Sequence, residues 1–309
     1  MTLEQLRIFI AVAERQHVTR AAADLNLTQS AVSAAISSLE TRHDVRLFDR
    51  VGRNIVLNQA GELFLQEARA VLARAAAAET ALADLGGLKR GRLSVHASQT
   101  IASYWLPARL VAFQADYPGV EVEVAIGNTA EATEHVLAGT AELGLVEGEI
   151  DDPALSREVI GADHMVVVVG NGHPWVRKPP ETPHDLLTSA WVLRERGSGT
   201  RSVFEATLEK AGVDLQTLRV ALTLPANEAV LSAVEAGAGA TAISASAAAA
   251  GLRAGVLHRI AFELPARSFY LLRHKQRYRS KAGDVFVGLA RSMASTLEGD
   301  WATGDGALI

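Results

Sequence analysis

The segment Thr19–Glu40, TRAAADLNLTQSAVSAAISSLE, predicts two short helices joined by a tight polar turn. Its first apolar stripe ends at Asn26, and a second begins at Val32 and recurs at the i, i+4, i+7 spacing of a helix face. This arrangement is typical of a helix-turn-helix, whose second helix enters the major groove of DNA. An ordinary amphipathic helix pair with a polar outer face would show the same periodicity, so this segment alone leaves both interpretations open.

The face of the second helix opposite its apolar stripe carries small and mostly hydroxylated side chains. Small side chains let a helix backbone approach DNA closely, and hydroxyl and amide groups can reach base edges and phosphates. Thr28 is the expected N-cap of this helix. We therefore expect DNA contacts from Thr19, Arg20, Thr28, Gln29, Ser30, Ser33, Ala34 and Ser37.

A basic segment follows the helix pair and predicts a wing. Leu47 and Phe48 would fix this segment to the core, and a turn precedes a short alternating strand at 54–57. Arg50 and Arg53 flank the turn. We expect both to bind DNA phosphates, which would set the register of the complex and make its affinity salt-dependent.

A longer pattern runs through the N-terminal region, and it consists of Ala21–Ala22, Leu25, Gln29, Val32–Ser33, Leu39–Glu40, Leu47–Phe48, Arg50, Arg53 and Ala60–Gly61. It resembles the winged helix-turn-helix of LysR-type transcriptional regulators. The resemblance implies that double-stranded operator DNA is a partner. Ala34–Ala35 depart from the family pattern, which often has a polar or basic side chain there, and this shifts base readout toward the helix start and the wing. Asn58 replaces the usual threonine.

Length, charge and composition narrow the class of protein. A chain of 309 residues should hold two or three domains. The formal net charge is −5, but residues 1–58 hold seven arginines against six acids, so DNA affinity would depend on where the arginines lie and on a second copy. The chain has no cysteine, which excludes disulfides and Cys-ligated metals. It shows no signal peptide and no long apolar run, so we expect a cytoplasmic protein without membrane contact.

Residues 59–90 predict a long linker helix that ends in a glycine-rich hinge. Over Ala60–Leu85, apolar residues recur at alternating spacings of four and three, which is a heptad seam that favours a partner helix. We expect this helix to form a homodimer, and the dimers to form a tetramer. A helix packed only on its own domain is the alternative. The seam consists of Phe64, Ala68, Val71, Ala75, Ala78, Leu82 and Leu85.

From residue 91 the pattern changes to alternating strands and helices, and the same unit occurs twice. Each unit should form mostly parallel strands with polar loops at their carboxyl ends. The chain should cross between two lobes over 157–169 and return over 264–272. This clam-shell resembles periplasmic binding proteins and the effector domain of LysR-type regulators.

The expected fold is therefore an all-α winged helix-turn-helix head, a linker helix, and a two-lobed α/β effector-binding domain. The predicted bounds are 1–58 for the head, 59–90 for the linker and 91–309 for the effector-binding domain, with lobe 1 at about 91–162 and 267–300 and lobe 2 at about 163–266.

Polar loops open four of the expected helices in the two lobes. Helix N-termini bind anions through free N–H groups and partial positive charge, although each polar residue could equally serve only as an N-cap. Arg201 would add a fixed charge. Glu147 would border the cleft and repel a dianion unless an arginine pairs with it. The candidate effector-binding residues are Ser98, Gln99, Thr100, Asn128, Thr129, Glu147, Gly197, Ser198, Gly199, Thr200, Arg201, Asn227 and Glu228.

Two of these segments carry a narrower resemblance. LRERGSGTR, at 193–201, and LPANEAV, at 224–230, resemble the LysR-type regulators of sulfur assimilation, especially of sulfite reduction. More loosely, they resemble regulators of carbon-fixation operons. The resemblance implies a small anionic effector, such as sulfite or a related sulfur oxyanion.

Enzyme motifs are not matched. The segment around Ser198 fits neither a P-loop nor G-x-S-x-G, and no two histidines have H-E-x-x-H spacing. We therefore expect no catalytic residue, no metal and no cofactor. A small-anion binding protein or an enzyme on a two-lobed fold, with the N-terminal region used for assembly, is the alternative from another class.

Overall fold

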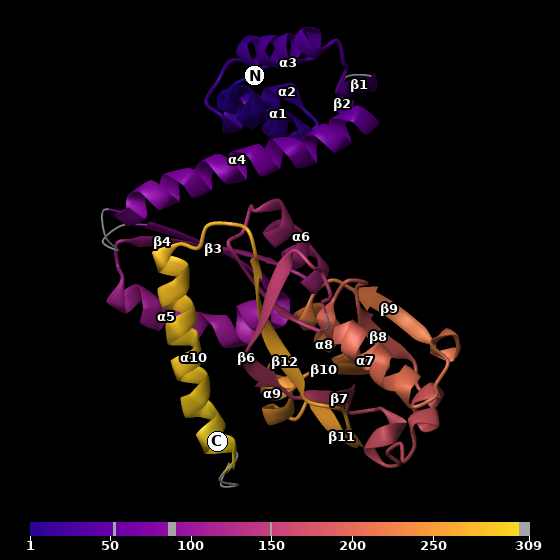
Figure 1. Ribbon diagram of the computed structural model, residues 1–309. Coiled ribbons are helices and arrows are strands. Elements are labelled where there is room, and N and C mark those ends of the chain that lie inside the picture. The colour runs from indigo at the N-terminus through magenta and orange to yellow at the C-terminus, as the bar shows by residue number, and fades with distance from the viewer. Residues whose placement is uncertain (52–53, 86–90, 149, 303–309) are drawn as a thin grey trace. The chain divides into compact units, whose positions relative to one another are not determined.

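The computed structural model describes residues 1–51, 54–85, 91–148 and 150–302. Met1–Leu85 forms one compact unit, to which the short segment Ala138–Thr140 is also assigned, and the rest of the α/β region forms a second (Figure 1). The linker helix therefore belongs to the same compact unit as the helix-turn-helix.

The N-terminal unit begins with helices α1 (Leu3–Arg15), α2 (Val18–Asp24) and α3 (Gln29–His43). Between α2 and α3, Asn26 adopts a left-handed conformation with φ of 54°, which an asparagine tolerates better than most residues. Thr28 caps α3, because its Oγ1 accepts a hydrogen bond from the Ala31 N–H at 3.2 Å. The predicted helix-turn-helix is confirmed.

The wing consists of β1 (Phe48–Val51) and β2 (Asn54–Leu57), which pair in antiparallel register. Leu47 and Phe48 are buried, as predicted, and the rings of Phe9 and Phe48 lie 5.4 Å apart between centroids. The aromatic contact anchors the first wing strand to α1.

Helix α4 (Gln59–Leu85) begins one residue before the expected start at Ala60. Asn58 explains this start, because its Oδ1 accepts from the Gly61 N–H at 2.9 Å while its Nδ2 donates to the Arg46 carbonyl at 3.0 Å. A Cβ at Gly61 would lie 2.1 Å from the Leu47 carbonyl oxygen, so only glycine allows this close packing.

The heptad seam of α4 divides into two parts. Phe64 and Ala68 pack into the core of the head, together with the apolar faces of α1 to α3. Further along, Val71, Leu82 and Leu85 are 41%, 71% and 83% exposed. The second part of the seam is therefore the part that remains available to another helix.

Lobe 1 is a mixed sheet with the strand order β4-β3-β5-β12-β6. Its β3 is parallel to β4 and β5, whereas β12 is antiparallel to β5 and β6. The elements are β3 (Gly91–Ser98), the π-helix η1 (Ile101–Trp105), α5 (Leu106–Asp116), β4 (Val120–Gly127), α6 (Thr129–Ala138), β5 (Leu143–Glu147), β6 (Leu155–Asp163), β12 (Arg267–His274) and α10 (Lys281–Ala302).

Lobe 2 repeats this plan with the strand order β11-β7-β10-β8-β9. Its β8 is parallel to β9 and β10, and β7 is antiparallel to β10 and β11. The elements are β7 (Met165–Gly170), the 3-10 helices η2 (Pro174–Val176) and η3 (Pro183–Thr188), β8 (Trp191–Arg194), α7 (Gly199–Lys210), the 3-10 helix η4 (Leu215–Thr217), β9 (Val220–Leu224), α8 (Asn227–Glu235), β10 (Ala240–Ser244), α9 (Ala245–Arg253) and β11 (Leu257–Glu263).

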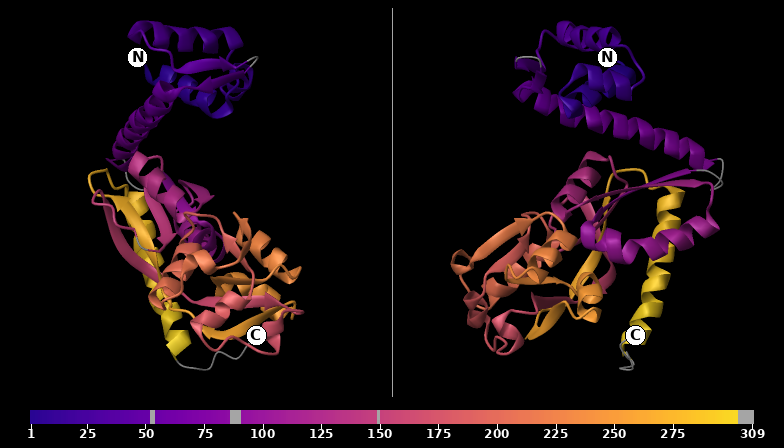
Figure 2. Two further views of the ribbon diagram at one scale, coloured as in Figure 1. Left: turned by 90° about the vertical axis from the view of Figure 1, so that its right-hand side faces the viewer. Right: turned by 180° about the vertical axis from the view of Figure 1, so that it is seen from behind.

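The two-lobed α/β fold is confirmed, with one qualification on strand direction. The repeated strand-helix units are parallel, as expected, but the strands that carry the chain between lobes run antiparallel to their neighbours. The helical segment that follows β3 also divides into η1 and α5, because Pro107 has no N–H to continue the ladder. Helices α5 and α10 lie side by side in Figures 1 and 2, and Phe113 packs on Phe286 between them.

Candidate DNA-binding face and interlobe site

The exposed side of α3 includes side chains predicted to contact DNA. Val32, Ile36 and Leu39 are buried in the core of the head, so the opposite side of the helix faces solvent. Its side chains are short, which lets the helix backbone approach another surface closely. The exposed candidates on this helix are Gln29, Ser30, Ser33, Ala34 and Ser37.

The remaining predicted DNA contacts lie on α2, at the start of α3 and on the wing. Thr19 and Arg20 are exposed on α2, and Arg50 is exposed on β1. Thr28 is exposed as well, but its hydroxyl already caps α3. Arg53 lies outside the described residues.

The two lobes contact each other where helices follow strands. The Gln99 Oε1 of lobe 1 accepts from the Asn227 backbone N–H of lobe 2 at 2.6 Å. The Ala130 N–H of lobe 1 donates to the Gly197 carbonyl of lobe 2 at 3.2 Å. Predicted loops from both lobes are therefore brought together at one interlobe site.

Asn227 is the buried link between Arg194 and Thr100. The Arg194 Nη1 donates to Asn227 Oδ1 at 2.5 Å, and since an arginine only donates, this contact fixes the orientation of the amide. Asn227 Nδ2 then donates to Thr100 Oγ1 at 3.3 Å. The Thr100 hydroxyl thus acts as an acceptor here, and its proton has no acceptor among the described residues.

Arg267 is a functional candidate that sequence reasoning missed. Its Nε and Nη2 donate to Asp163 Oδ2 at 2.9 and 2.7 Å. Its Nη1 donates to Thr200 Oγ1 at 2.9 Å and lies 3.4 Å from Glu147 Oε1. Arg267 is therefore the arginine that pairs with Glu147. An arginine in the expected return crossing, 264–272, was the signal in the sequence.

Two buried oxygen atoms at this site lack hydrogen-bond partners among the described residues. They are Ser98 Oγ and Glu147 Oε2, and their residues are 3% and 2% exposed. Ser98 ends β3 and Glu147 ends β5, which are neighbouring parallel strands. Because buried polar groups are normally paired, each oxygen marks a place where a further hydrogen bond can form.

The helix starts differ in how their N–H groups are satisfied. Asn128 Oδ1 accepts from the Glu131 N–H at 3.0 Å, and Glu131 Oε2 accepts from the Asn128 N–H at 3.1 Å, so Asn128 serves as a cap. Thr129 Oγ1 donates to the backbone carbonyl that ends β5, at 2.8 Å. In contrast, Ser198 at α7 and Ala226 at α8 make no side-chain cap.

Gly199 allows a close approach between the lobes. A Cβ at this position would lie 2.2 Å from the Glu147 carbonyl oxygen and 2.7 Å from Thr129 Oγ1. Gly197 has a φ of +90°, a conformation that disfavours other residues. Both glycines thus belong to the site through backbone geometry.

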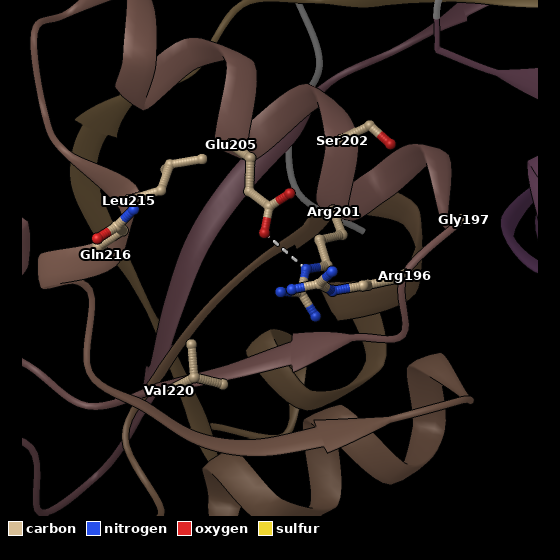
Figure 3. Close-up of a pocket in the computed structure, with 8 residues that line it drawn as sticks. All are labelled: Arg196, Gly197, Arg201, Ser202, Glu205, Leu215, Gln216 and Val220. Atoms are coloured by element: carbon tan, nitrogen blue, oxygen red, sulfur yellow. Dashed lines mark hydrogen bonds and ion pairs between the residues drawn. The ribbon is translucent and has the colours of Figure 1, made fainter.

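Arg201 does not supply charge to the interlobe hydroxyls in this structure. Its Nε pairs with Glu205 Oε1 at 2.7 Å, four residues along α7, and its Nη1 donates to the Arg194 carbonyl at 3.1 Å. Figure 3 shows its side chain in a separate pocket of about 480 Å³, beside Arg196. The helix turns Arg201 away from the side on which Thr200 meets Arg267.

Glu228 lies at the edge of the interlobe site. Its Oε1 accepts from the Tyr104 hydroxyl of lobe 1 at 3.1 Å. Burial and the neighbouring Glu228 carboxylate raise the pKa of Tyr104 to about 12. Tyr104 therefore stays a neutral donor, and this contact adds another hydrogen bond between the lobes.

Comparison with protein families connects both regions to known classes. Residues 3–62 match the bacterial regulatory helix-turn-helix protein of the lysR family, and residues 86–295 match the LysR substrate binding domain. The chain belongs to the LysR family. Members of this family are transcriptional regulators rather than enzymes. This chain is accordingly a DNA-binding regulator with a domain for small effectors.

Two similar proteins each match nearly the whole length of this chain. The uncharacterized HTH-type transcriptional regulator YeiE of Escherichia coli K12 is 34% identical, over 91% of this chain and 94% of YeiE. A probable RuBisCO transcriptional regulator of Trichormus variabilis is 33% identical, over 92% of this chain and 86% of that protein. These names do not support the expected sulfur-assimilation subgroup.

A solved structure supports the fold and the DNA-binding class. Full-length CbnR complexed with its target DNA is 26% identical, with a TM-score of 0.69, and the match covers 94% of this chain and 99% of CbnR. Among the described residues, no helix is long and apolar enough to cross a bilayer. The same residues contain no group of three or more His, Asp or Glu side chains placed to hold a metal ion.

Proposed function

We propose that this LysR-type regulator senses a small anionic metabolite at the interlobe site. The supporting observation is the state of two buried hydroxyls on opposite lobes. Thr100 accepts from Asn227, and Thr200 accepts from Arg267, so each hydroxyl uses a lone pair on a fixed N–H group. Each hydroxyl proton is then left to donate, which suits an anion between the lobes.

Two buried arginines beside these hydroxyls support the same proposal. Arg194 and Arg267 are 5% and 4% exposed and lie within hydrogen-bond distance of Asn227 and Thr200. Helix α7 begins without a side-chain cap, so its first N–H groups add partial positive charge. Arg267 is shared between the carboxylates of Glu147 and Asp163, and Arg194 is paired with Glu195.

The proposed signal is a change in lobe closure. Hydrogen bonds from Gln99 and Tyr104 link the two lobes in this structure. An anion bound to Thr100 and Thr200 would favour one degree of lobe closure over another. Homodimers formed by the exposed part of the α4 seam, and tetramers of these dimers, would pass the change to paired heads on operator DNA. The cytoplasm, where operator DNA lies, is the proposed location.

Two observations favour different classes of anion as the effector. Resemblance at 193–201 and 224–230 favours sulfite or a related sulfur oxyanion, whereas the RuBisCO regulators among the relatives favour a metabolite of carbon fixation. A thermal-shift panel of sulfite, sulfate, thiosulfate, phosphate and small carboxylates would rank these classes, because a ligand of the native state raises its melting temperature.

Calorimetry with the strongest anion of that panel tests the site. Thr100→Val and Thr200→Val each remove one hydrogen bond to a charged group, worth about 1.5–3 kcal/mol, so affinity should fall about 10- to 100-fold. Thr100→Ser and Thr200→Ser keep the hydroxyl and should retain most of the affinity. Arg201→Ala, in the separate pocket, should leave it within a few-fold. Unchanged affinity in both valine variants would place the effector elsewhere.

Footprinting of operator DNA with the same variants separates the sensor from the head. The valine variants should bind the operator like wild type and lose only the effector-dependent change in the footprint.

A further inference from the structure

We infer that the effector must carry a hydrogen-bond donor as well as negative charge, and that Glu147 imposes this requirement. The inference rests on the proposed function, because it concerns the anion at the interlobe site. It names the chemical class of effector as an oxyanion that keeps a proton, such as hydrogen phosphate, a phosphate monoester monoanion or a hydroxycarboxylate.

The position of Glu147 provides the first step. Its side chain is 3% exposed, and its Oε1 lies 3.4 Å from Arg267 Nη1. The same Nη1 donates to Thr200 Oγ1 at 2.9 Å. One nitrogen atom therefore joins the Thr200 hydroxyl and the Glu147 carboxylate, so an anion bound to Thr200 lies next to this carboxylate.

The chemistry of the two carboxylate oxygens provides the second step. As the ion-pair partner of Arg267, Glu147 is a carboxylate, and a carboxylate only accepts hydrogen bonds. Glu147 Oε1 pairs with Arg267, but Glu147 Oε2 is buried and has no hydrogen-bond partner among the described residues. An effector oxygen without a proton would face Oε2 as a like charge, whereas an O–H or N–H group would satisfy it.

Neighbouring groups do not supply that donor. The Arg267 guanidinium is committed through Nε and Nη2 to Asp163 and through Nη1 to Thr200. The Thr129 hydroxyl, which lies nearby, donates to the backbone carbonyl of Glu147 instead. Among the described residues no group donates a hydrogen bond to Oε2 in this structure, so a donor on the ligand would meet an unpaired acceptor.

Ser98 supports a mixed ligand of this kind. Its hydroxyl is buried at the end of β3, next to β5, and has no hydrogen-bond partner among the described residues. A hydroxyl both donates and accepts, so it can bind either a bare or a protonated oxygen. Ser98 thus strengthens the binding of either kind of oxyanion. The discrimination between protonated and unprotonated oxyanions depends on Glu147.

Phosphate and sulfate are the appropriate probes for the full-length protein. They have the same tetrahedral shape, but at pH 7 phosphate keeps at least one O–H group and sulfate keeps none. Calorimetry should show phosphate binding about 10- to 100-fold more tightly than sulfate, since one charged hydrogen bond is replaced by a like-charge contact. Thr200→Val should weaken phosphate binding, which assigns the binding to the interlobe site.

Glu147→Gln tests the assignment, because its amide can donate to a bare oxygen. The variant should lose most of the preference and bind sulfate at least as well as phosphate. Glu123→Gln, at an exposed position on β4 where the carboxylate pairs with Arg92, is the matched control and should keep the preference.

The outcomes distinguish the two proposals. Equal binding of phosphate and sulfate by the wild type, with both weakened in Thr200→Val, would overturn the donor requirement and leave the anion site standing. A phosphate preference that persists in a folded Glu147→Gln variant would overturn the role of Glu147. Binding unaffected by Thr200→Val, or no binding of either anion to wild type and variant, would overturn the anion site and this inference with it.

Discussion

Replacing Arg267 by methionine should destabilise the effector-binding domain strongly. Arg267 side-chain atoms are 2% exposed, and those of Asp163 and Glu147 are 5% and 3% exposed. The substitution leaves two buried carboxylates without their cation. Removing one partner of a buried ion pair typically costs about 3–5 kcal/mol, and for a domain of this size that corresponds to a fall in Tm of about 6–20 °C.

Tryptophan fluorescence provides a selective assay for this prediction. All four tryptophans follow residue 100, so urea unfolding of the full chain followed by their emission reports on the α/β domain and not on the head. The triple variant Arg267→Met, Asp163→Asn, Glu147→Gln removes all three charges and should recover much of the loss. An Arg267→Met variant with the midpoint of the wild type would refute the reasoning, and so would a triple variant that is no more stable than the single one.

Three further predictions concern the head, the linker and the sensor. Arg50→Ala should weaken binding to operator and random DNA alike and lower the slope of log affinity against log salt by about one, as measured by anisotropy titrations; an unchanged slope would contradict a phosphate contact. Val71→Asp should dissociate the dimer in sedimentation experiments, because it places an unpaired charge on the exposed seam, whereas the off-seam control Arg74→Ala should remain dimeric. Burial, and electrostatic repulsion with the neighbouring His135, lower the pKa of His96 from 6.5 to about 4, so the folded state resists protonation and stability should fall as the pH drops from 6.5 toward 4. His96→Gln should flatten that loss in pH-dependent unfolding, and an equally steep loss would assign it to other groups.

Local signals in the sequence predicted the elements of the fold well. Thr28 as a cap and the stripe of Val32 and Ile36 depend on neighbours a few residues away, and both are found as predicted. The repeated strand-helix unit predicted both lobes and both crossings, since each unit must bury its own apolar face. The antiparallel direction of β6 and β12 follows from how the chain returns, which periodicity does not encode.

The candidate site was less predictable because its contacts are long-range. Arg267 and Thr200 are 67 residues apart, and Gln99 and Asn227 are 128 apart, so no local pattern joins them. The sequence around Arg201 favoured an ion pair within the helix over effector binding, because Glu205 stands at the i+4 position. The exposed α3 face and Arg50 could be chosen from the sequence, since exposure on a helix or wing depends mostly on periodicity.

The cross-strand pair of Arg267 and Asp163 also marks the junction of an inserted domain. Lobe 2 leaves the lobe 1 sheet after Asp163 and returns at Arg267, and these two residues are partners in adjacent antiparallel strands. Among the described residues, those in the apolar core of lobe 1 all come from before or after this junction. A tight turn in place of lobe 2 would therefore preserve the sheet of lobe 1, and lobes from related sensors could be exchanged at this point to build chimeric regulators.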